Sequence, residues 1–378
     1  MRYFDVLVED INRGQQGLNV GLPFGFPRLT EYVPNIQQGT YYSIGGEAGS
    51  GKTALVDNMF VLNPIKWYLE NKDRTDIKIK ILYFSFEVTL VNKIAKFAAW
   101  KLYDNKKILV DINYIKSRAN NKIDENIKSH ILKLEKEIDV LESIVQIYDT
   151  PINPTGISKI LQKFYDENGK YEKVDEYTKK YVPNNPNLYV IGIFDHIGLT
   201  KKEQGFNKKE TLDKLSEYCV YHRNKHNFIP VAVSQFNRSL ADAERQLKLK
   251  GSKTINYESL RPQQSDWKDT GAIGEDANVM IGLFSPNRYE IPCFDGYEIG
   301  SLEDRFRSIN VPKARDGVPD ISLGLAYLGE IGLFKELPKA DDMMIKSKET
   351  GKNFYQTIND IKKYVGEDSS EGKQNSLF

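Results

Sequence analysis

The glycine-rich segment Gly46–Thr53 has the residue types and spacing that hold a chain of phosphates. Its glycines let the backbone curl so that successive N–H groups point at one oxyanion, where a side chain would obstruct the approach. Lys52 would reach the β- and γ-phosphates, and the Thr53 hydroxyl would bind Mg²⁺. The segment fits the P-loop pattern at every specified position, so the sequence predicts a site for ATP or GTP with Mg²⁺. The expected binding residues are Gly46, Gly49, Ser50, Gly51, Lys52 and Thr53.

Two carboxylates stand where they could complete this chemistry. Asp195 follows the continuous apolar run Leu188–Phe194, and Glu87 follows the run Ile77–Phe86. Strand ends converge on the crevice where ligands bind in open α/β sheets, so we expect both side chains near the phosphates. Asp195 is the candidate to support Mg²⁺, and Glu87 is the candidate to activate the attacking water. The alternatives are that Asp195 only caps the next turn and that Glu87 is only the first solvated residue after a buried strand.

Gln235 and a pair of histidines are further candidates. Gln235 follows the expected strand Val231–Ser234, and its amide can hydrogen-bond a γ-phosphate or the attacking water. His222 and His226 lie one turn apart on an expected helix, which is the spacing of a metal-ligand pair. No third ligand follows them in the sequence, so we expect a solvated helix face rather than a metal site.

The candidate residues are held in place by strands and helices that the sequence predicts. Apolar, β-rich runs alternate with helical patterns along the chain. The alternation is typical of an α/β fold in which helices cover both faces of a mainly parallel, twisted sheet. The expected strands are Tyr41–Ile44, Ile77–Phe86, Ile144–Tyr148, Leu188–Phe194, Val231–Ser234, Val279–Phe284, Ser308–Val311 and Ile321–Tyr327. The expected helices are Lys52–Met59, Asn92–Tyr103, Gly156–Phe164, Thr211–His226, Thr270–Ala277 and one amphipathic helix over Ile123–Leu141.

The composition limits the classes of protein that this chain can represent. The chain has 378 residues, 40% of them hydrophobic, so it can bury a full core. Its net charge of +1 gives no overall positive surface that would attract nucleic acid. Its two cysteines, Cys219 and Cys293, cannot build a disulfide framework or a four-thiolate zinc site. No uncharged apolar run approaches the roughly twenty residues of a membrane span, and Met1–Asn12 lacks the pattern of a signal peptide. We therefore expect a soluble protein of the cytoplasm with no membrane partner.

The order of the motifs resembles that of the C-terminal motor domain of the DnaB-type replicative helicases, which are RecA-like P-loop ATPases. The resemblance extends from about Gly17 to Leu337, so it covers far more than the phosphate loop. Besides that loop it includes Phe84–Glu87, Asp149–Pro151, Phe194–Ile197, Ser234–Arg238, Ser265–Ile273 and Val311–Gly317.

The resemblance implies a function for each matching residue of the nucleotide site. Lys52 and Thr53 would bind ATP and Mg²⁺. Glu87 would be the catalytic acid, Asp195 would support Mg²⁺, and Gln235 would sense the γ-phosphate. These roles agree with the chemistry expected from the residue types alone.

Lys313 and Arg315 match a pair that reaches into the nucleotide site of the neighbouring subunit. Such an arginine finger, supplied in trans, stabilises charge on the transferring phosphoryl group through a planar guanidinium. Without the resemblance, both residues read as solvated positions on a strand.

A loop after Asp266 matches the part of the family that lines a central channel. Lys268, Asp269 and Gly271 fall on positions that hold successive phosphates of single-stranded DNA, a contact that is independent of base sequence. Without the resemblance, this segment reads as a polar loop that opens a helix. A second candidate lining comprises Arg245, Lys248, Lys250 and Lys253, although such a run of charges is more often a solvated face.

The chain divides into one large domain and two short additions. We expect a motor domain over residues 17–337, a surface insertion over 166–187 and a partly disordered C-terminal extension over 338–378. Residues 1–16 are expected to form a short helix that could dock on a neighbouring subunit. The segment before Gly46 is too short for the N-terminal collar domain of DnaB-type helicases, so we expect the chain to lack that domain.

The resemblance therefore implies a ring-forming replicative DNA helicase that couples ATP hydrolysis at subunit interfaces to translocation and duplex unwinding. The implied partners are single-stranded DNA, further copies of the chain in a hexamer, and a primase or helicase loader. The alternatives are a RecA-like recombination or strand-exchange ATPase and a regulatory or assembly ring ATPase that acts on proteins. Richness in Lys, Ile, Asn and Tyr suggests an AT-rich genome, such as that of a phage, with the host cytoplasm as its location.

Overall fold

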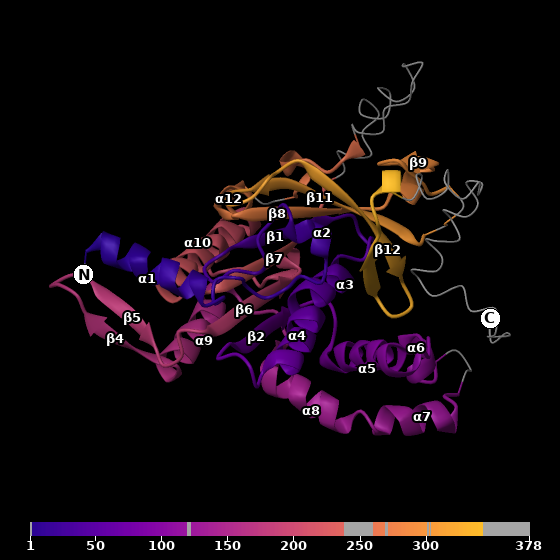
Figure 1. Cartoon of the computed structure of the whole chain (residues 1–378), viewed down its shortest axis with the longest axis horizontal. Helices are drawn as coiled ribbons and strands as arrows, with labels where there is room; N and C mark the ends of the chain where they lie inside the picture. Colours follow the sequence, from indigo (N-terminus) through magenta and orange to yellow (C-terminus); the bar gives the residue numbers. More distant parts are fainter. Residues whose placement is uncertain are drawn as a thin grey trace, which may run out of the picture.

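A nine-stranded sheet forms the centre of the molecule (Figure 1). The computed structural model describes residues 2–118, 122–237, 260–268, 271–300, 302 and 304–342. The strands of the sheet are β1 (Tyr42–Gly46), β2 (Lys78–Ser85), β3 (Val145–Tyr148), β6 (Leu188–Asp195), β7 (Ile229–Gln235), β8 (Val279–Phe284), β11 (Phe306–Ala314), β12 (Ile321–Leu328) and β13 (Leu333–Glu336). Their spatial order is β13-β12-β11-β8-β1-β7-β6-β2-β3.

The sheet combines a parallel part with an antiparallel extension. All pairs from β8 through β1, β7, β6 and β2 to β3 are parallel. Strands β11, β12 and β13 add to β8 by antiparallel pairing. The predicted α/β fold with a mainly parallel sheet is thus confirmed.

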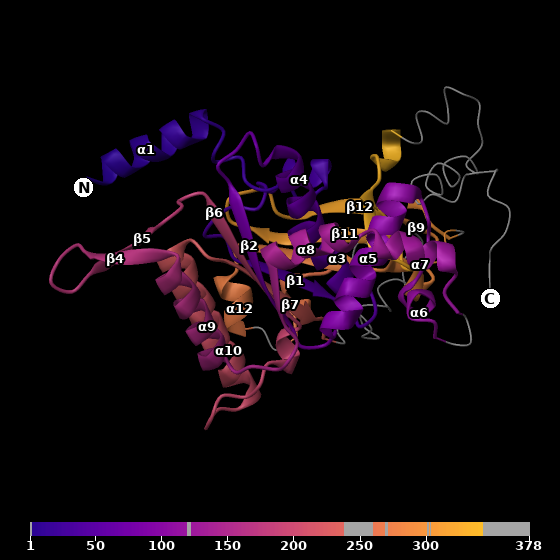
Figure 2. The same cartoon turned by 90° about the horizontal axis from the view of Figure 1, so that it is seen from below.

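Helices cover both faces of the sheet (Figure 2). One face packs against α3 (Lys52–Asp57), α5 (Leu90–Lys106) and α8 (Glu135–Ile144), and the other packs against α9 (Pro154–Glu167), α10 (Lys208–His226) and α12 (Gly271–Asp276). Neighbouring strand residues alternate between the two cores: Ile81 and Tyr83 lie in the first, whereas Leu82 and Phe84 lie in the second. This alternation explains why the central strands are continuous apolar runs, because both of their faces are buried.

Smaller elements complete the described part of the chain. The helical ones are α2 (Pro27–Thr30), α6 (Ile112–Ile115) and the short turns Ile197–Leu199, Gln264–Asp266 and Pro286–Tyr289. Strands β9 (Cys293–Phe294) and β10 (Tyr297–Glu298) form a small hairpin.

The single helix predicted over Ile123–Leu141 is wrong, because the segment forms α7 (Glu125–Leu132) and α8. The break lies at Leu134, whose backbone leaves the helical path at φ −84° and ψ 2°. The Leu134 side chain is buried with Ala98 and Leu102 of α5. Burial of the Leu134 side chain thus outweighs the helical spacing of apolar residues that continues through the segment. Helix propensity is a weak constraint compared with the free energy of burial.

The helix after the phosphate loop is longer than predicted and is not uniform. The α3 helix passes into a π-helix over Asn58–Leu62 and then into α4 (Asn63–Asn71). The π-helix ends two residues before Pro64, which has no N–H group for a helical hydrogen bond. The Asn58 side chain donates to the carbonyl oxygens of Ala54 and Gly332, which fastens the helix to the loop before β13.

Within the expected insertion 166–187, strands β4 (Gly169–Lys173) and β5 (Lys179–Pro183) form an antiparallel hairpin. Its base packs on α9 and α10 through Tyr181, whose ring meets Tyr165 edge-on at a centroid distance of 5.5 Å. The Tyr181 hydroxyl also donates to the Tyr165 carbonyl oxygen. The hairpin thereby covers one side of α10.

The expected solvated face at His222 and His226 is wrong, because both side chains are buried. The His226 ring stacks on Tyr165 at 4.0 Å between centroids, and His222 Nε2 lies 3.0 Å from the Ser158 hydroxyl. The α9 helix and the hairpin supply this cover, which the sequence of α10 does not reveal. In the part of the chain that the structure describes, no group of three His, Cys, Asp or Glu residues could hold a metal ion.

The N-terminal helix α1 (Tyr3–Gln15) extends away from the sheet (Figure 2). Its residues Phe4, Leu7 and Ile11 are exposed. A helix therefore forms where one was predicted, while its docking on a neighbouring subunit stays a prediction. Of the expected C-terminal extension 338–378, residues 343–378 lie outside the described residues.

Candidate active site

The phosphate loop connects the end of β1 to the start of α3. All five residues of β1 are buried, and α3 begins at Lys52. Gly49 and Gly51 have φ values of 69° and 101°, in the left-handed region that favours glycine. The start of a helix then directs its N–H groups toward a bound anion.

Lys52 lies in a partly dehydrated position beside the loop. Its ammonium donates to the carbonyl oxygen of Glu47 at 2.7 Å. Burial lowers the pKa of Lys52 to about 8, against the opposing effect of the Asp195 and Glu87 carboxylates. A bound phosphate would raise this pKa again, since nearby negative charge favours an ammonium.

Asp195 and Thr53 come together from distant parts of the sequence. The Thr53 hydroxyl donates to Asp195 Oδ1 at 3.2 Å, and Asp195 is only 1% exposed. Parallel pairing of β6 with β2 and β7 brings the end of β6 to the same edge as the phosphate loop. The predicted proximity of Asp195 to the phosphate loop is therefore present in the structure.

Glu87 lies just beyond β2, on the same edge of the sheet. Its side chain is 58% exposed, and Glu87 Oε2 lies 4.0 Å from His196 Nε2. Burial lowers the pKa of His196, which favours the neutral imidazole near pH 7. The cation that acts on Glu87 is then the Lys52 ammonium. A solvent-facing carboxylate in this position can accept a proton from water.

Gln235 is the last residue of β7 and pairs with Gly46 in the register of β1 and β7. The next residue, Phe236, donates its N–H to the Gly46 carbonyl oxygen at 3.0 Å. The Gln235 carbonyl oxygen accepts from the Lys268 N–H, also at 3.0 Å. The structure thus joins the expected phosphate sensor to the first residue of the expected DNA loop.

The expected DNA loop is only partly described. Lys268 is exposed and Gly271 opens α12, whereas Asp269 lies outside the described residues, as do Arg245, Lys248, Lys250 and Lys253. The Ser234 hydroxyl donates to the Lys268 carbonyl oxygen at 3.3 Å. Both backbone groups of Lys268 therefore bond to the end of β7.

Lys313 and Arg315 lie far from the phosphate loop of their own chain. Lys313 pairs with Met280 near the start of β8, whereas the loop follows the opposite end of the neighbouring β1. Both side chains donate to the Glu275 carbonyl oxygen, Lys313 at 2.8 Å and Arg315 at 2.7 Å. The structure therefore does not bring this pair together with the other site residues.

Three residues that the sequence analysis missed hold the phosphate loop in place. Arg307 is fully buried and donates from Nε to the Ser50 carbonyl oxygen at 2.9 Å. Arg288 donates to the Ala48 carbonyl oxygen at 2.6 Å, and the Tyr289 hydroxyl donates to Glu47 Oε1 at 2.6 Å. Nothing in the local sequence marks these residues, because Arg288 and Tyr289 reach the loop through the pairing of β8 with β1, and Arg307 through the addition of β11 to β8.

None of the helices in the described ranges is long and apolar enough to cross a membrane.

Comparison with known proteins identifies relatives of this chain. Residues 21–336 match the family described as the DnaB-like helicase C terminal domain. The replicative DNA helicase DnaB of Helicobacter pylori is 22% identical over 293 residues, which are 77% of this chain and 49% of that protein. The chain thus spans about half the length of the curated relatives that it matches.

Two solved structures have a similar fold. One, titled as an ATPase domain, covers 89% of this chain and 99% of its own, with a TM-score of 0.64 and 17% identity. The other, titled as a DnaB-like replicative helicase and its interactions with primase, covers 89% of this chain and 67% of its own, with a TM-score of 0.59 and 18% identity. At this identity the likeness shows a shared fold of the RecA-like ATPase type.

Proposed function

Because this chain belongs to the family of DnaB-like helicase C-terminal domains, we propose that it is the motor of a replicative DNA helicase that hydrolyses ATP. The observation that carries the proposal is the hydrogen bond between Thr53 and the buried Asp195 beside the phosphate loop. A hydroxyl and a carboxylate held together next to a glycine loop are the parts that bind a metal-nucleotide complex.

The residues around Thr53 and Asp195 fit Mg²⁺. They present oxygen atoms, which Mg²⁺ prefers, and Mg²⁺ is bound by one or two carboxylates together with phosphate oxygens. When bound, Mg²⁺ would neutralise charge on the β- and γ-phosphates. Lys52 would add a positive charge to the same phosphates.

The other site residues act on the water and the γ-phosphate. Glu87 accepts a proton from the attacking water, and Gln235 donates a hydrogen bond to the γ-phosphate. The backbone contact between Gln235 and Lys268 supports coupling of the nucleotide state to the DNA loop. Lys268, Asp269 and Gly271 would hold single-stranded DNA through its phosphates.

The active site is completed by a second subunit, with Lys313 and Arg315 supplied in trans. The distance along β11 supports this arrangement. Arg307 contacts the phosphate loop, and Lys313 lies six strand positions further on, about 20 Å away at the rise of a β-strand. A ring of identical subunits, a hexamer in the proposed form, brings this end of β11 to the next subunit's nucleotide. Helix α1 would dock on a neighbour, and a primase or a helicase loader would bind the ring.

The test is ATP hydrolysis and strand separation by the purified chain. We expect Mg-ATP hydrolysis that increases with single-stranded DNA and unwinding of a forked duplex. Single strands that leave the ATPase rate unchanged would contradict a DNA motor and would favour a ring ATPase that acts on proteins. Filaments on DNA, seen by electron microscopy in place of closed rings, would favour a strand-exchange ATPase.

A further inference from the structure

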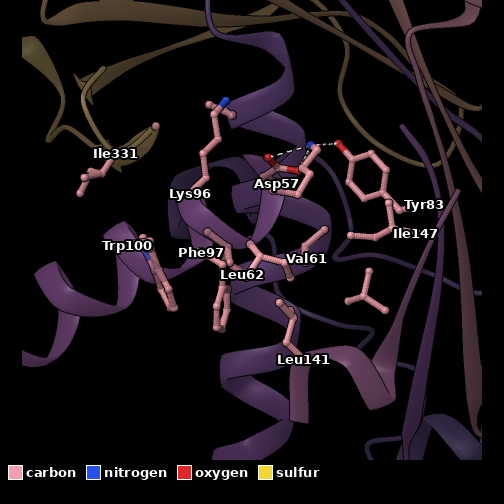
Figure 3. Close-up of a pocket in the computed structure, with 15 residues that line it drawn as sticks. Asp57, Val61, Leu62, Tyr83, Lys96, Phe97, Trp100, Leu141, Ile147 and Ile331 are labelled. Carbon is pink, nitrogen blue, oxygen red and sulfur yellow. Dashed lines mark hydrogen bonds and ion pairs between the residues drawn. The ribbon is translucent and has the colours of Figure 1, made fainter. Parts of the chain in front are cut away.

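A buried lysine links α5 to the nucleotide site. Lys93 is 8% exposed, and its ammonium lies 3.0 Å from Asp57 Oδ1 and 2.6 Å from the Tyr83 hydroxyl oxygen. The dashed lines in Figure 3 follow these contacts at the polar end of an otherwise apolar pocket. A lysine ammonium is rarely buried without partners, because removing its charge from water costs free energy. Asp57 and Tyr83 offset that cost here.

The direction of the hydrogen bonds follows from the chemistry of the groups. A lysine ammonium has donors only, so the Tyr83 oxygen must accept from Lys93. The Tyr83 hydroxyl proton is then directed to Asp195 Oδ2, at 3.1 Å. Lys93 Nζ itself lies 3.8 Å from the same carboxylate oxygen.

The two carboxylate oxygens of Asp195 therefore have different partners. Oδ2 accepts from Tyr83 on the α5 side, and Oδ1 accepts from Thr53 on the phosphate-loop side. Rotation of the carboxylate would break both hydrogen bonds. The network thus fixes the plane of the carboxylate, so that one oxygen always faces the phosphate loop.

The charges in the network also leave Asp195 available to a cation. Asp57 bonds to Lys93 through both carboxylate oxygens, at 3.0 and 3.1 Å, so one negative charge offsets the ammonium. Asp195 interacts with Lys93 only at 3.8 Å and receives a neutral hydroxyl from Tyr83. The ion pair of Lys93 with Asp195 is thus longer than the one with Asp57, which leaves more of the Asp195 charge for a metal cation.

We propose that Lys93 and Tyr83 are positioning residues that orient Asp195 for the Mg²⁺ of the nucleotide site. The inference rests on the proposed function of this site as an ATPase centre. Neither residue touches the nucleotide in this arrangement. Hydrogen-bond partners behind a metal-supporting carboxylate fix its orientation, and their loss weakens metal binding.

The test is a Mg²⁺ titration of nucleotide binding with the full chain. A fluorescent ADP analogue reports binding as Mg²⁺ is added to wild type, Lys93→Met and Tyr83→Phe. We expect the Mg²⁺ concentration at half-saturation to increase roughly ten- to hundred-fold in both variants. Affinity for the analogue without Mg²⁺ should stay at the wild-type value, because the phosphate loop is unchanged.

Lys96→Met is the matched control. Lys96 lies one turn further along α5, lines the same pocket and extends away from Asp57 and Tyr83 (Figure 3). It should titrate with Mg²⁺ as wild type does. Lys93→Met leaves the Asp57 carboxylate without its cationic partner, which destabilises the fold. The double variant Lys93→Met/Asp57→Asn removes both charges, so it tests the inference in a folded protein even where the single variant does not fold.

Each outcome decides the inference. Wild-type Mg²⁺ dependence in folded Lys93→Met or in Tyr83→Phe would overturn it, as would an equal loss of binding with and without Mg²⁺. A normal wild-type titration without ATP hydrolysis would overturn the proposed function alone. A wild-type chain that binds no nucleotide at any Mg²⁺ concentration would overturn both.

Discussion

At the scale of single residues, the site depends on side chains whose environments differ sharply. Asp195 is buried and Lys52 is partly buried, whereas Glu87 is mostly exposed. Lys52 and Asp195 suit binding of charged phosphates and their metal ion, because electrostatic interactions strengthen where water is partly excluded. The exposed carboxylate suits contact with the attacking water. Binding and hydrolysis should therefore be separable by substitution.

Lys52→Ala and Glu87→Gln should separate the two steps. Lys52→Ala should abolish detectable nucleotide binding, since the loop loses its ammonium. Glu87→Gln should retain wild-type nucleotide affinity and lose roughly 10²- to 10⁴-fold in ATP turnover, as expected for loss of a general base. Binding of a fluorescent nucleotide and steady-state phosphate release measure the two effects. Retained turnover in Glu87→Gln would remove Glu87 from this role.

Arg307 illustrates a residue whose importance only burial reveals. Its guanidinium bonds to the Ser50 and Asp304 carbonyl oxygens and stacks on the Tyr327 ring at 4.6 Å. In the sequence it is one basic residue in a strand with both polar and apolar neighbours. Its place behind the phosphate loop arises from the antiparallel addition of β11 to β8.

At the scale of elements, α9, α10 and the β4–β5 hairpin share one buried aromatic cluster. His222 and His226 lie at its centre, with their Nδ1 atoms 3.1 Å apart. Tyr171 hydrogen-bonds His226 Nε2 at 2.8 Å, and Ser158 contacts His222. The charge of Lys225 also acts on both rings and favours their neutral forms. The cluster fastens the hairpin to the helices, so its stability should respond to protonation of the imidazoles.

The free energy of unfolding should decrease as the pH falls from about 7 toward 4. Burial lowers the pKa of His222 to about 4 and that of His226 to about 3, below the ordinary value of 6.5. The unfolded chain therefore binds protons first, and the folded state loses stability as the pH falls through this window. We expect a loss approaching roughly 2 kcal/mol from each histidine by pH 5.

Urea unfolding at pH 7 and pH 5 measures this loss, with His226→Phe as the comparison. The variant keeps an aromatic ring in the stack with Tyr165 but has no titrating group, so its stability should change less between the two pH values. An equal change in both proteins would assign the effect to other residues. Conversely, a His130→Phe variant should retain the wild-type pH dependence, because His130 lies outside the cluster.

At the scale of the whole molecule, the described chain holds most residues of the proposed nucleotide site at one edge of the sheet and the Lys313–Arg315 pair at the other. Antiparallel β11 runs between the two edges. The pair contacts α12 carbonyl oxygens, and α12 follows the expected DNA loop. An assembly in which each subunit completes its neighbour's site would therefore also connect neighbouring DNA loops.

Mixing Arg315→Ala subunits into wild-type assemblies tests this arrangement. Isolated Arg315→Ala protein should lose roughly 10³- to 10⁵-fold in turnover, the contribution of an arginine finger. In mixtures, DNA-stimulated ATPase should fall in a graded way as the fraction of variant subunits increases. Activity proportional to the wild-type fraction, with no loss beyond dilution, would contradict a coupled site shared between subunits.

The sequence by itself determined the phosphate loop, the strand that precedes it and the acids Asp195 and Glu87 at strand ends. These features are local, since apolar runs specify buried strands and glycines specify the loop. Tertiary structure alone decided the break at Leu134, the burial of His222 and His226, and the networks around Arg307 and Lys93. Each of these depends on side chains from distant segments, so no spacing within one segment can encode it. The physical reason is that burial and hydrogen-bond partners are properties of the packed sheet and its helices.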